Sequence, residues 1–132
     1  LTYIEPKLGV EKPLFLMDYP IQMGALARAK PGQPHIAERV ELYIAGLELA
    51  NGYSELTDAS EQRQRWEEEV ELRVANNTPH ASSLDAGLLN ALAWGMPPTT
   101  GIAFGLDRPL MILRDAPTIQ DVLPFPLSEP TM

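Results

Sequence analysis

The sequence contains no cysteine, which excludes disulfide bridges, thiolate zinc sites and cysteine nucleophiles. It also has no apolar run near the roughly 18 residues that a membrane span needs and no signal peptide, so we expect a soluble cytoplasmic protein without a membrane partner. Basic residues are scarce, because 10 Lys and Arg oppose 18 Asp and Glu for a net charge of −8. Phosphate contacts to nucleic acids come mostly from clustered Lys and Arg. This excess of negative charge therefore argues against nucleic-acid binding by this chain alone, and it suits a basic or metal-bound partner.

The residues that are present describe an ordinary globular chain. Its 132 residues amount to one domain, and 45% of them are hydrophobic, which is enough for a buried core. Proline is abundant, with 13 residues, about twice the average usage. The first residue is Leu rather than Met, so we expect a piece of a longer protein.

The clearest local pattern is a β-hairpin between residues 40 and 51. Apolar and polar residues alternate on both sides of Ala45-Gly46, which predicts two antiparallel strands joined by a two-residue turn. The pattern assigns Leu42, Ile44, Leu47 and Leu49 to the core-facing side. It assigns Glu41, Tyr43 and Glu48 to the opposite side.

Other elements are predicted around this hairpin. A buried strand is predicted over Leu14–Met17, a short helix over Gln22–Ala29 and a surface loop over Lys30–Pro34. Asp58 is predicted to cap a helix that ends near Asn76, and a second helix carries Leu84, Leu88, Leu89 and Leu92 before Gly95. A strand over Gly101–Leu106 and a helix starting at Asp107-Arg108-Pro109 follow. This order predicts an α+β fold, an antiparallel sheet flanked by helices.

The two hairpin glutamates could form a cation site. Glu41 and Glu48 are diagonal neighbours across the predicted hairpin, with Cβ atoms about 7 Å apart. Carboxylates at that separation could hold one or two Mg²⁺ ions, whose bonds to oxygen are about 2.0–2.1 Å long. The same pattern also describes a solvated strand face, and the pattern alone favours that simpler interpretation.

The end of the second hairpin strand is rich in polar groups. Strict alternation places Asn51, Tyr53 and Glu55 on the face opposite Glu48, whereas a bulge at Gly52 would return Tyr53 and Glu55 to the face of Glu48. A buried Glu beside an aromatic ring suits a substrate ammonium group, and an Asn suits a substrate carboxylate. The pattern alone describes equally an ordinary strand end with an exposed Glu.

A third candidate segment follows residue 100. Gly101 and Gly105 lie in a predicted strand, where glycine allows close approach of a flat ligand or another backbone. Arg108 lies in the first turn of the next helix, where its charge adds to the helix-terminal amides and favours phosphate.

Together these segments resemble the catalytic domain of class II aminoacyl-tRNA synthetases of the lysyl branch. The resemblance extends from about Phe15 to Phe125 and assigns residues 1–132 to the C-terminal portion of that domain. The matching stretches are Ala37–Tyr43, Gly46–Leu56, Asp58-Ala59 with Gln62 and Arg65, Gly95–Gly101, and the third signature motif ending at Asp107-Arg108.

The resemblance implies a role for each candidate residue. Glu41 and Glu48 would bind the Mg²⁺ ions of ATP, and Arg108, beside Gly105, would stack on adenine or hold the γ-phosphate end of bent ATP. Asn51 would contact the amino-acid carboxylate, Tyr53 would line the side-chain pocket, and Glu55 would pair with the side-chain ammonium of lysine.

Two departures from the usual family sequence favour one branch of this family. Bacterial lysyl-tRNA synthetases usually have Ile-Gly where this chain has Leu49-Ala50, and Gly where it has Ala103. The residues found here resemble the paralogous branch that attaches a β-lysyl group to a lysine of translation elongation factor P, and the methyl group of Ala103 would reshape the amino-acid pocket. A lysyl-tRNA synthetase that charges tRNA and a non-catalytic interaction module remain the alternatives.

The resemblance also implies missing parts. The family's first motif, which builds a homodimer interface, and its second, whose Arg holds the α-phosphate, would precede Leu1. Without that Arg, stabilisation of the pentacoordinate phosphorus would be incomplete. We therefore expect a fragment that cannot adenylate by itself.

Overall fold

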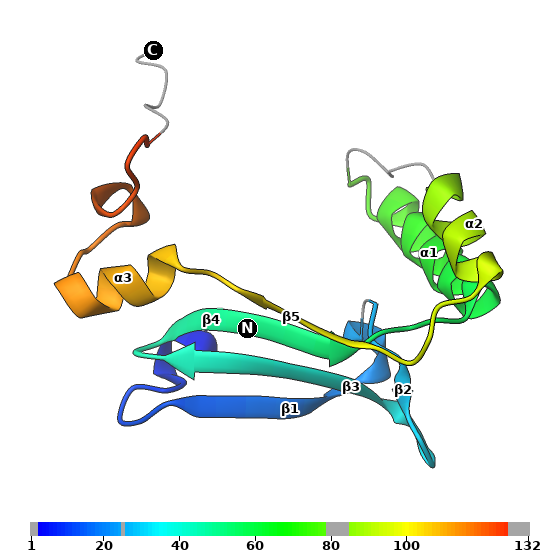
Figure 1. Ribbon diagram of the computed structural model, residues 1–132, viewed down its shortest axis with the longest axis horizontal. Coiled ribbons are helices and arrows are strands. Elements are labelled where there is room, and N and C mark those ends of the chain that lie inside the picture. Colours follow the sequence, from blue (N-terminus) through cyan, green and yellow to red (C-terminus); the bar gives the residue numbers. More distant parts are fainter. Residues whose placement is uncertain (1–2, 25, 79–84, 127–132) are drawn as a thin grey trace. The chain divides into compact units, whose positions relative to one another are not determined.

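The computed structural model describes residues 3–24, 26–78 and 85–126, and its centre is a five-stranded sheet (Figure 1). The strands are β1 (Leu14–Pro20), β2 (Ala29–Lys30), β3 (Gln33–Ile44), β4 (Leu47–Ser54) and β5 (Thr100–Phe104). The helices are α1 (Ala59–Ala75), α2 (Ala86–Trp94) and α3 (Asp107–Arg114), with 3₁₀ turns η1 (Glu5–Lys7), η2 (Ile21–Met23) and η3 (Ile119–Asp121). The strand order is β1-β3-β4-β5, and β2 pairs with β3. The predicted α+β class with an antiparallel sheet is confirmed.

The chain divides into two compact units. Unit 1 comprises Leu1–Met17, Val40–Gly52 and Ile102–Met132, and unit 2 comprises Asp18–Arg39 and Tyr53–Gly101. Strands β1, β3, β4 and β5 each contribute residues to both units. No helix in the described ranges is long and apolar enough to cross a membrane.

The hairpin of β3 and β4 has the predicted two-residue turn. Ala45 and Gly46 both have positive φ angles, 52° and 78°, as a type I′ turn requires. The preceding segment holds this turn, because the Ala45 amide donates to the Gly9 carbonyl at 2.8 Å and the Gly46 amide to the Leu8 carbonyl at 2.9 Å. The hairpin end is thus anchored by backbone hydrogen bonds within unit 1.

The helix predicted over Gln22–Ala29 is wrong. A single 3₁₀ turn occupies Ile21–Met23, and Ala27 forms a β-bridge to Glu55. The Arg28 amide donates to the Ser54 carbonyl at 2.9 Å, so strand pairing takes the backbone groups that a helix would use. The predicted surface loop is also shorter than expected, since Lys30 pairs with Gln33 across a tight turn and β3 continues from there.

Burial in the strands differs from the prediction at two places. Strand β1 forms as predicted, but Phe15 and Met17 are 62% and 63% exposed, because β1 is last in the strand order and has only β3 beside it. In β3, Glu41 and Tyr43 are buried while Leu42 and Ile44 are only partly buried. The interpretation of the Glu41 face as a solvated surface is therefore wrong.

The predicted helix boundaries are largely confirmed. The Asp58 carboxylate caps α1, accepting hydrogen bonds from the amides of Ser60 at 2.8 Å and Glu61 at 2.9 Å. Helix α2 ends at Gly95, which has a φ of 108°, although the predicted helical residue Leu84 lies outside the described residues. Helix α3 begins at Asp107 with Pro109 in its first turn, which places Arg108 at its amino end.

Candidate functional site

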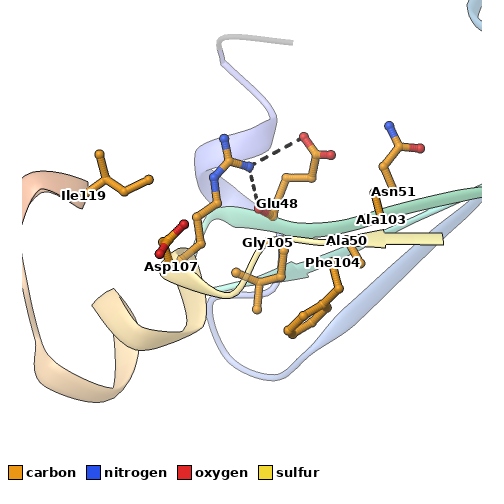
Figure 2. A pocket seen from close by; sticks show the side chains of 10 residues that line it. Glu48, Ala50, Asn51, Ala103, Phe104, Gly105, Asp107 and Ile119 are labelled. Atoms are coloured by element: carbon orange, nitrogen blue, oxygen red, sulfur yellow. Dashed lines mark hydrogen bonds and ion pairs between the residues drawn. The ribbon is translucent and has the colours of Figure 1, made fainter. Parts of the chain in front are cut away.

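A pocket of about 300 Å³ lies in unit 1, where β4, β5, α3 and η3 contribute side chains (Figure 2). Its lining residues are Glu48, Leu49, Ala50, Asn51, Ala103, Phe104, Gly105, Asp107, Arg108 and Ile119. This volume is at the lower end of the range for small-molecule sites. Five of the site residues predicted from the sequence belong to this lining: Glu48, Asn51, Ala103, Gly105 and Arg108.

Arg108 and Glu48 meet at this pocket although 60 positions separate them in the sequence. The Arg108 guanidinium donates from Nη1 to the Glu48 carbonyl oxygen at 2.5 Å, and the same nitrogen lies 3.8 Å from Glu48 Oε2 (dashed lines in Figure 2). A cation in the first turn of a helix is unfavourable by itself, because the helix amino terminus already carries partial positive charge. The two Glu48 oxygens offset that cost, and the Arg108 side chain remains 47% exposed.

Gly105 lies where β5 meets the start of α3. Its amide donates to the Leu49 carbonyl at 2.9 Å, which joins the end of β5 to β4. A Cβ at Gly105 would approach no atom more closely than that carbonyl, at 3.9 Å, an ordinary van der Waals distance. Packing within the protein does not require glycine here, so the open space faces the pocket.

Asn51 lies on the same side of β4 as Glu48, with Ala50 on the other side (Figure 2). Regular alternation would place residues three apart on opposite faces. Leu49 and Ala50 are both buried, each 4% exposed, and both line the pocket with Glu48 and Asn51. The prediction that Asn51 faces away from Glu48 is wrong, and the Asn51 amide joins the Glu48 carboxylate in the pocket lining.

Glu41 does not line this pocket. Its carboxylate Oε2 accepts a 2.6 Å hydrogen bond from the Tyr43 hydroxyl, and the two side chains are 6% and 2% exposed. The pKa of Tyr43 is raised, first by burial, then by this hydrogen bond, and further by the negative charges of Glu41, Glu5 and Glu48. Glu41 and Glu48 therefore both raise the pKa of the Tyr43 hydroxyl. Of the three residues expected to bind ATP and its Mg²⁺ ions, Glu41, Glu48 and Arg108, only Glu48 and Arg108 line the pocket.

Tyr53 and Glu55 belong to unit 2. Tyr53 is partly buried against a cluster of Tyr19, Ala27 and Ala37. The pKa of its hydroxyl is raised by burial and, to a smaller extent, by the negative charge of Glu55, while the positive charge of Arg39 lowers it. The Glu55 amide donates to the Thr99 carbonyl at 2.9 Å.

Some lining residues were not predicted. Phe104, Asp107 and Ile119 complete the pocket; Phe104 and Asp107 adjoin predicted site residues in the sequence, and Ile119 does not. Ile119 comes from η3, eleven positions after Arg108, and no local pattern marks it as a lining residue. A sequence signal did exist for Ala50, since Leu49-Ala50 departs from the Ile-Gly expected for bacterial lysyl-tRNA synthetases.

Residues 5–129 match the family model described as tRNA synthetases class II (D, K and N). The chain belongs to this family. Among its class II relatives, a lysine–tRNA ligase of Thermosynechococcus vestitus is 46% identical over 96% of the chain and 24% of that protein. A lysine–tRNA ligase of Burkholderia multivorans is 48% identical over 87% of the chain and 22% of that protein.

A second kind of class II relative is nearly as similar. An elongation factor P–(R)-beta-lysine ligase of Erwinia tasmaniensis is 44% identical over 92% of the chain and 37% of that protein. The chain thus spans about a quarter of the length of the lysine–tRNA ligases and somewhat more than a third of this ligase. The relatives of both kinds are named as ligases that use lysine or its β-isomer.

Proposed function

We propose that this chain provides part of the nucleotide and amino-acid site of an ATP-dependent class II ligase that activates lysine or β-lysine. The observation that supports this most directly is the Arg108–Glu48 pair at a pocket in a chain that matches the class II family over residues 5–129. In the reaction, a carboxylate oxygen of the amino acid attacks the α-phosphorus of ATP. The bond to the β-phosphate oxygen breaks, and an aminoacyl-adenylate and pyrophosphate form.

Different pocket residues are assigned to different parts of ATP. Arg108, at the amino end of α3, holds the triphosphate or stacks on the adenine, and the space beside Gly105 admits a flat ring. Because Arg108 already contacts Glu48, its guanidinium is oriented before ATP binds, which lowers the entropy cost of binding.

The carboxylates fit a magnesium-bound nucleotide. Mg²⁺ at nucleotide sites commonly keeps several waters and uses one or two protein carboxylates together with phosphate oxygens. No group of three or more His, Cys, Asp or Glu residues suited to a metal occurs among the residues described. We assign Glu48 to this role at the pocket. Glu41 is the proposed second carboxylate, and to reach the ion it would have to turn from the Tyr43 hydroxyl, to which it is now bonded outside the pocket lining. The ion would neutralise phosphate charge.

The amino acid is assigned to the remaining polar groups. The Asn51 amide can donate to the substrate carboxylate, and Ala103 limits the space beside it. Glu55 is assigned to the side-chain ammonium and Tyr53 to an apolar wall because the family to which the chain belongs implies these roles. Each assignment follows from the chemistry of the group and from the family to which the chain belongs.

The acceptor that we propose is a lysine ε-amine of elongation factor P, to which a β-lysyl group is transferred. Ala50 and Ala103 both line the pocket, so methyl groups replace hydrogens at two positions where lysyl-tRNA synthetases have glycine. The net charge of −8 suits a basic protein acceptor. Charging of tRNA is the second candidate, because lysine–tRNA ligases are as similar to this chain as the elongation factor P ligase. We propose a homodimer for the full-length protein in either case.

Amino-acid-dependent ATP–pyrophosphate exchange on the full-length gene product tests this proposal. We expect exchange with (R)-β-lysine to exceed exchange with L-α-lysine, followed by transfer of label to elongation factor P. Preference for α-lysine together with tRNA charging would support the second candidate. Absence of ATP–Mg²⁺ binding by calorimetry would instead indicate a non-catalytic module.

The variant Glu55→Gln tests the amino-acid site separately. It removes the negative charge without changing the size of the side chain, so the KM for the lysine substrate should rise by about tenfold or more. The KM for ATP should stay within about twofold of the wild-type value, because the proposed role of Glu55 concerns the amino acid and not the nucleotide. Equal increases in both constants would contradict the assignment of Glu55.

A further inference from the structure

Gly101 and Glu55 are in close contact within unit 2. A Cβ built on Gly101 would lie 2.6 Å from Oε1 of Glu55 and 3.8 Å from its carboxyl carbon. The first distance is far shorter than a carbon–oxygen contact allows. The Glu55 carboxylate thus occupies the space that any larger residue at position 101 would fill.

The backbone of Glu55 is fixed on both sides of this contact. Its amide donates to the Thr99 carbonyl at 2.9 Å, and its backbone bridges to Ala27. The Ala27 carbonyl in turn accepts a 2.7 Å hydrogen bond from Nη1 of Arg65 on α1. Since neighbouring segments hold the backbone, a clash at position 101 must be relieved by the Glu55 side chain.

We propose that Gly101 is a positioning residue for amino-acid selection, because a residue without a side chain at this position leaves the space that the Glu55 carboxylate occupies. The inference rests on the proposed function, in which Glu55 binds the substrate ammonium. A charge-assisted hydrogen bond depends strongly on distance and angle. A displaced carboxylate therefore loses much of its attraction for the ammonium while remaining charged.

An alanine at position 101 isolates this effect. The φ of Gly101 lies outside the left-handed region, so alanine introduces no backbone strain. The atom that must move is the end of a flexible Glu side chain rather than backbone, so the fold should be retained. Gly101→Ala should consequently move the carboxylate at little cost in stability.

The experiment is a double-mutant cycle of Gly101→Ala and Glu55→Gln in the full-length gene product, measured by pyrophosphate exchange with L-α-lysine and with (R)-β-lysine. Gly101→Ala should raise the KM for the preferred lysine isomer about tenfold, with kcat and the KM for ATP nearly unchanged. In the Glu55→Gln background, the same change should raise that KM by less than about twofold, since the two residues act through one carboxylate. Gly87→Ala is the matched control, because it also adds a methyl beside a carboxylate, 3.1 Å from Oδ1 of Asp85, but away from Glu55.

The outcomes separate the inference from the function on which it rests. If the wild-type protein exchanges with lysine and Glu55→Gln raises its KM, but Gly101→Ala does not, the positioning role of Gly101 is wrong and the proposed function stands. Additive effects of the two changes would also refute a role exerted through Glu55. If the wild-type protein shows no lysine-dependent exchange, the proposed function fails and the inference fails with it. Unfolding curves and a crystal structure of Gly101→Ala should show a native fold with a displaced Glu55 carboxylate.

Discussion

The hydroxyl of Tyr43 donates a 2.6 Å hydrogen bond to the carboxylate of Glu41, and both side chains are buried on β3. Burial of an ionised carboxylate is costly unless hydrogen bonds compensate for the lost water. Glu5 and Glu48 add negative charge near the same hydroxyl, which favours the protonated phenol that can donate. Tyr43 therefore helps to keep a negatively charged carboxylate inside unit 1.

Replacement of Tyr43 by Phe should destabilise the protein. The change removes a hydrogen bond to a buried charged group, and such bonds contribute about 1.5–3 kcal/mol to the free energy of unfolding. Urea denaturation at pH 7 measures the loss. Tyr3→Phe is the control, because Tyr3 is 86% exposed and should change stability by less than about 0.5 kcal/mol. Equal stability of the two variants would show that the hydroxyl of Tyr43 does not stabilise Glu41.

Stability should fall in strongly alkaline solution. The pKa values of Tyr43 and Tyr53 are both raised above the ordinary value of 10, in each case chiefly by burial. The folded state therefore holds these protons more tightly than the unfolded state does, and their contribution is constant below pH 10 and is lost as the pH rises above it. Urea midpoints at pH 9, 10 and 11 should show this fall, and Tyr43→Phe should reduce its slope. An unchanged slope in that variant would contradict the raised pKa of Tyr43.

Gly9 should tolerate no side chain. Its φ is +67°, and a Cβ there would lie 2.2 Å from the Tyr43 carbonyl oxygen, a backbone atom that cannot rotate away. Gly9→Ala should cost about 1–2 kcal/mol for the left-handed backbone and about 1–3 kcal/mol more for the steric overlap. Gly32→Ala supplies the control, because Gly32 has a φ of +76° with nothing within 4 Å and should lose only the backbone contribution. If denaturant midpoints of the two variants agree, the N-terminal segment is not held against the hairpin.

Much of this fold could be predicted from local sequence. The hairpin of β3 and β4 has a period-two pattern and a turn at Ala45-Gly46, and the structure has both. Asp58 was predictable as a cap because its carboxylate bonds amides only two and three positions away. In each case the groups that decide the structure are sequence neighbours.

The wrong predictions concern residues whose structure depends on contacts with segments distant in the sequence. Gln22–Ala29 has a helical pattern, but Ala27 pairs with Glu55 instead, and no local signal encodes a partner 28 positions away. The burial of Tyr43 was unpredictable for a related reason, since the segment around Gly9 lies against it. At the site, the contact between Glu48 and Arg108 agrees with the prediction, whereas the position of Asn51 on the same side of β4 as Glu48 does not, because strict alternation places residues three apart on opposite faces.

Two arginines of α1 allow a matched test of how unit 2 is held together. Arg65 and Arg73 each pair with a glutamate four positions earlier, Glu61 and Glu69. Arg65 alone of the two also donates to the Ala27 carbonyl, at 2.7 Å, and its side chain is 18% exposed against 43% for Arg73. The helix geometry of the two pairs is the same, so a difference between them measures the tertiary contact.

Replacement of each arginine by Met keeps the length of an unbranched side chain and removes the charge. Arg65→Met should cost about 1.5–3 kcal/mol, because a charged hydrogen bond to a partly buried carbonyl is lost. Arg73→Met should cost about 0.3–0.5 kcal/mol, the usual contribution of an exposed i,i+4 pair. Denaturation in 1 M NaCl separates the two further, since screening should weaken the Arg73 pair but leave most of the Arg65 contribution. Because Ala27 bridges to Glu55, a large effect of Arg65→Met would also show that α1 helps to fix the backbone from which the proposed ammonium-binding carboxylate projects.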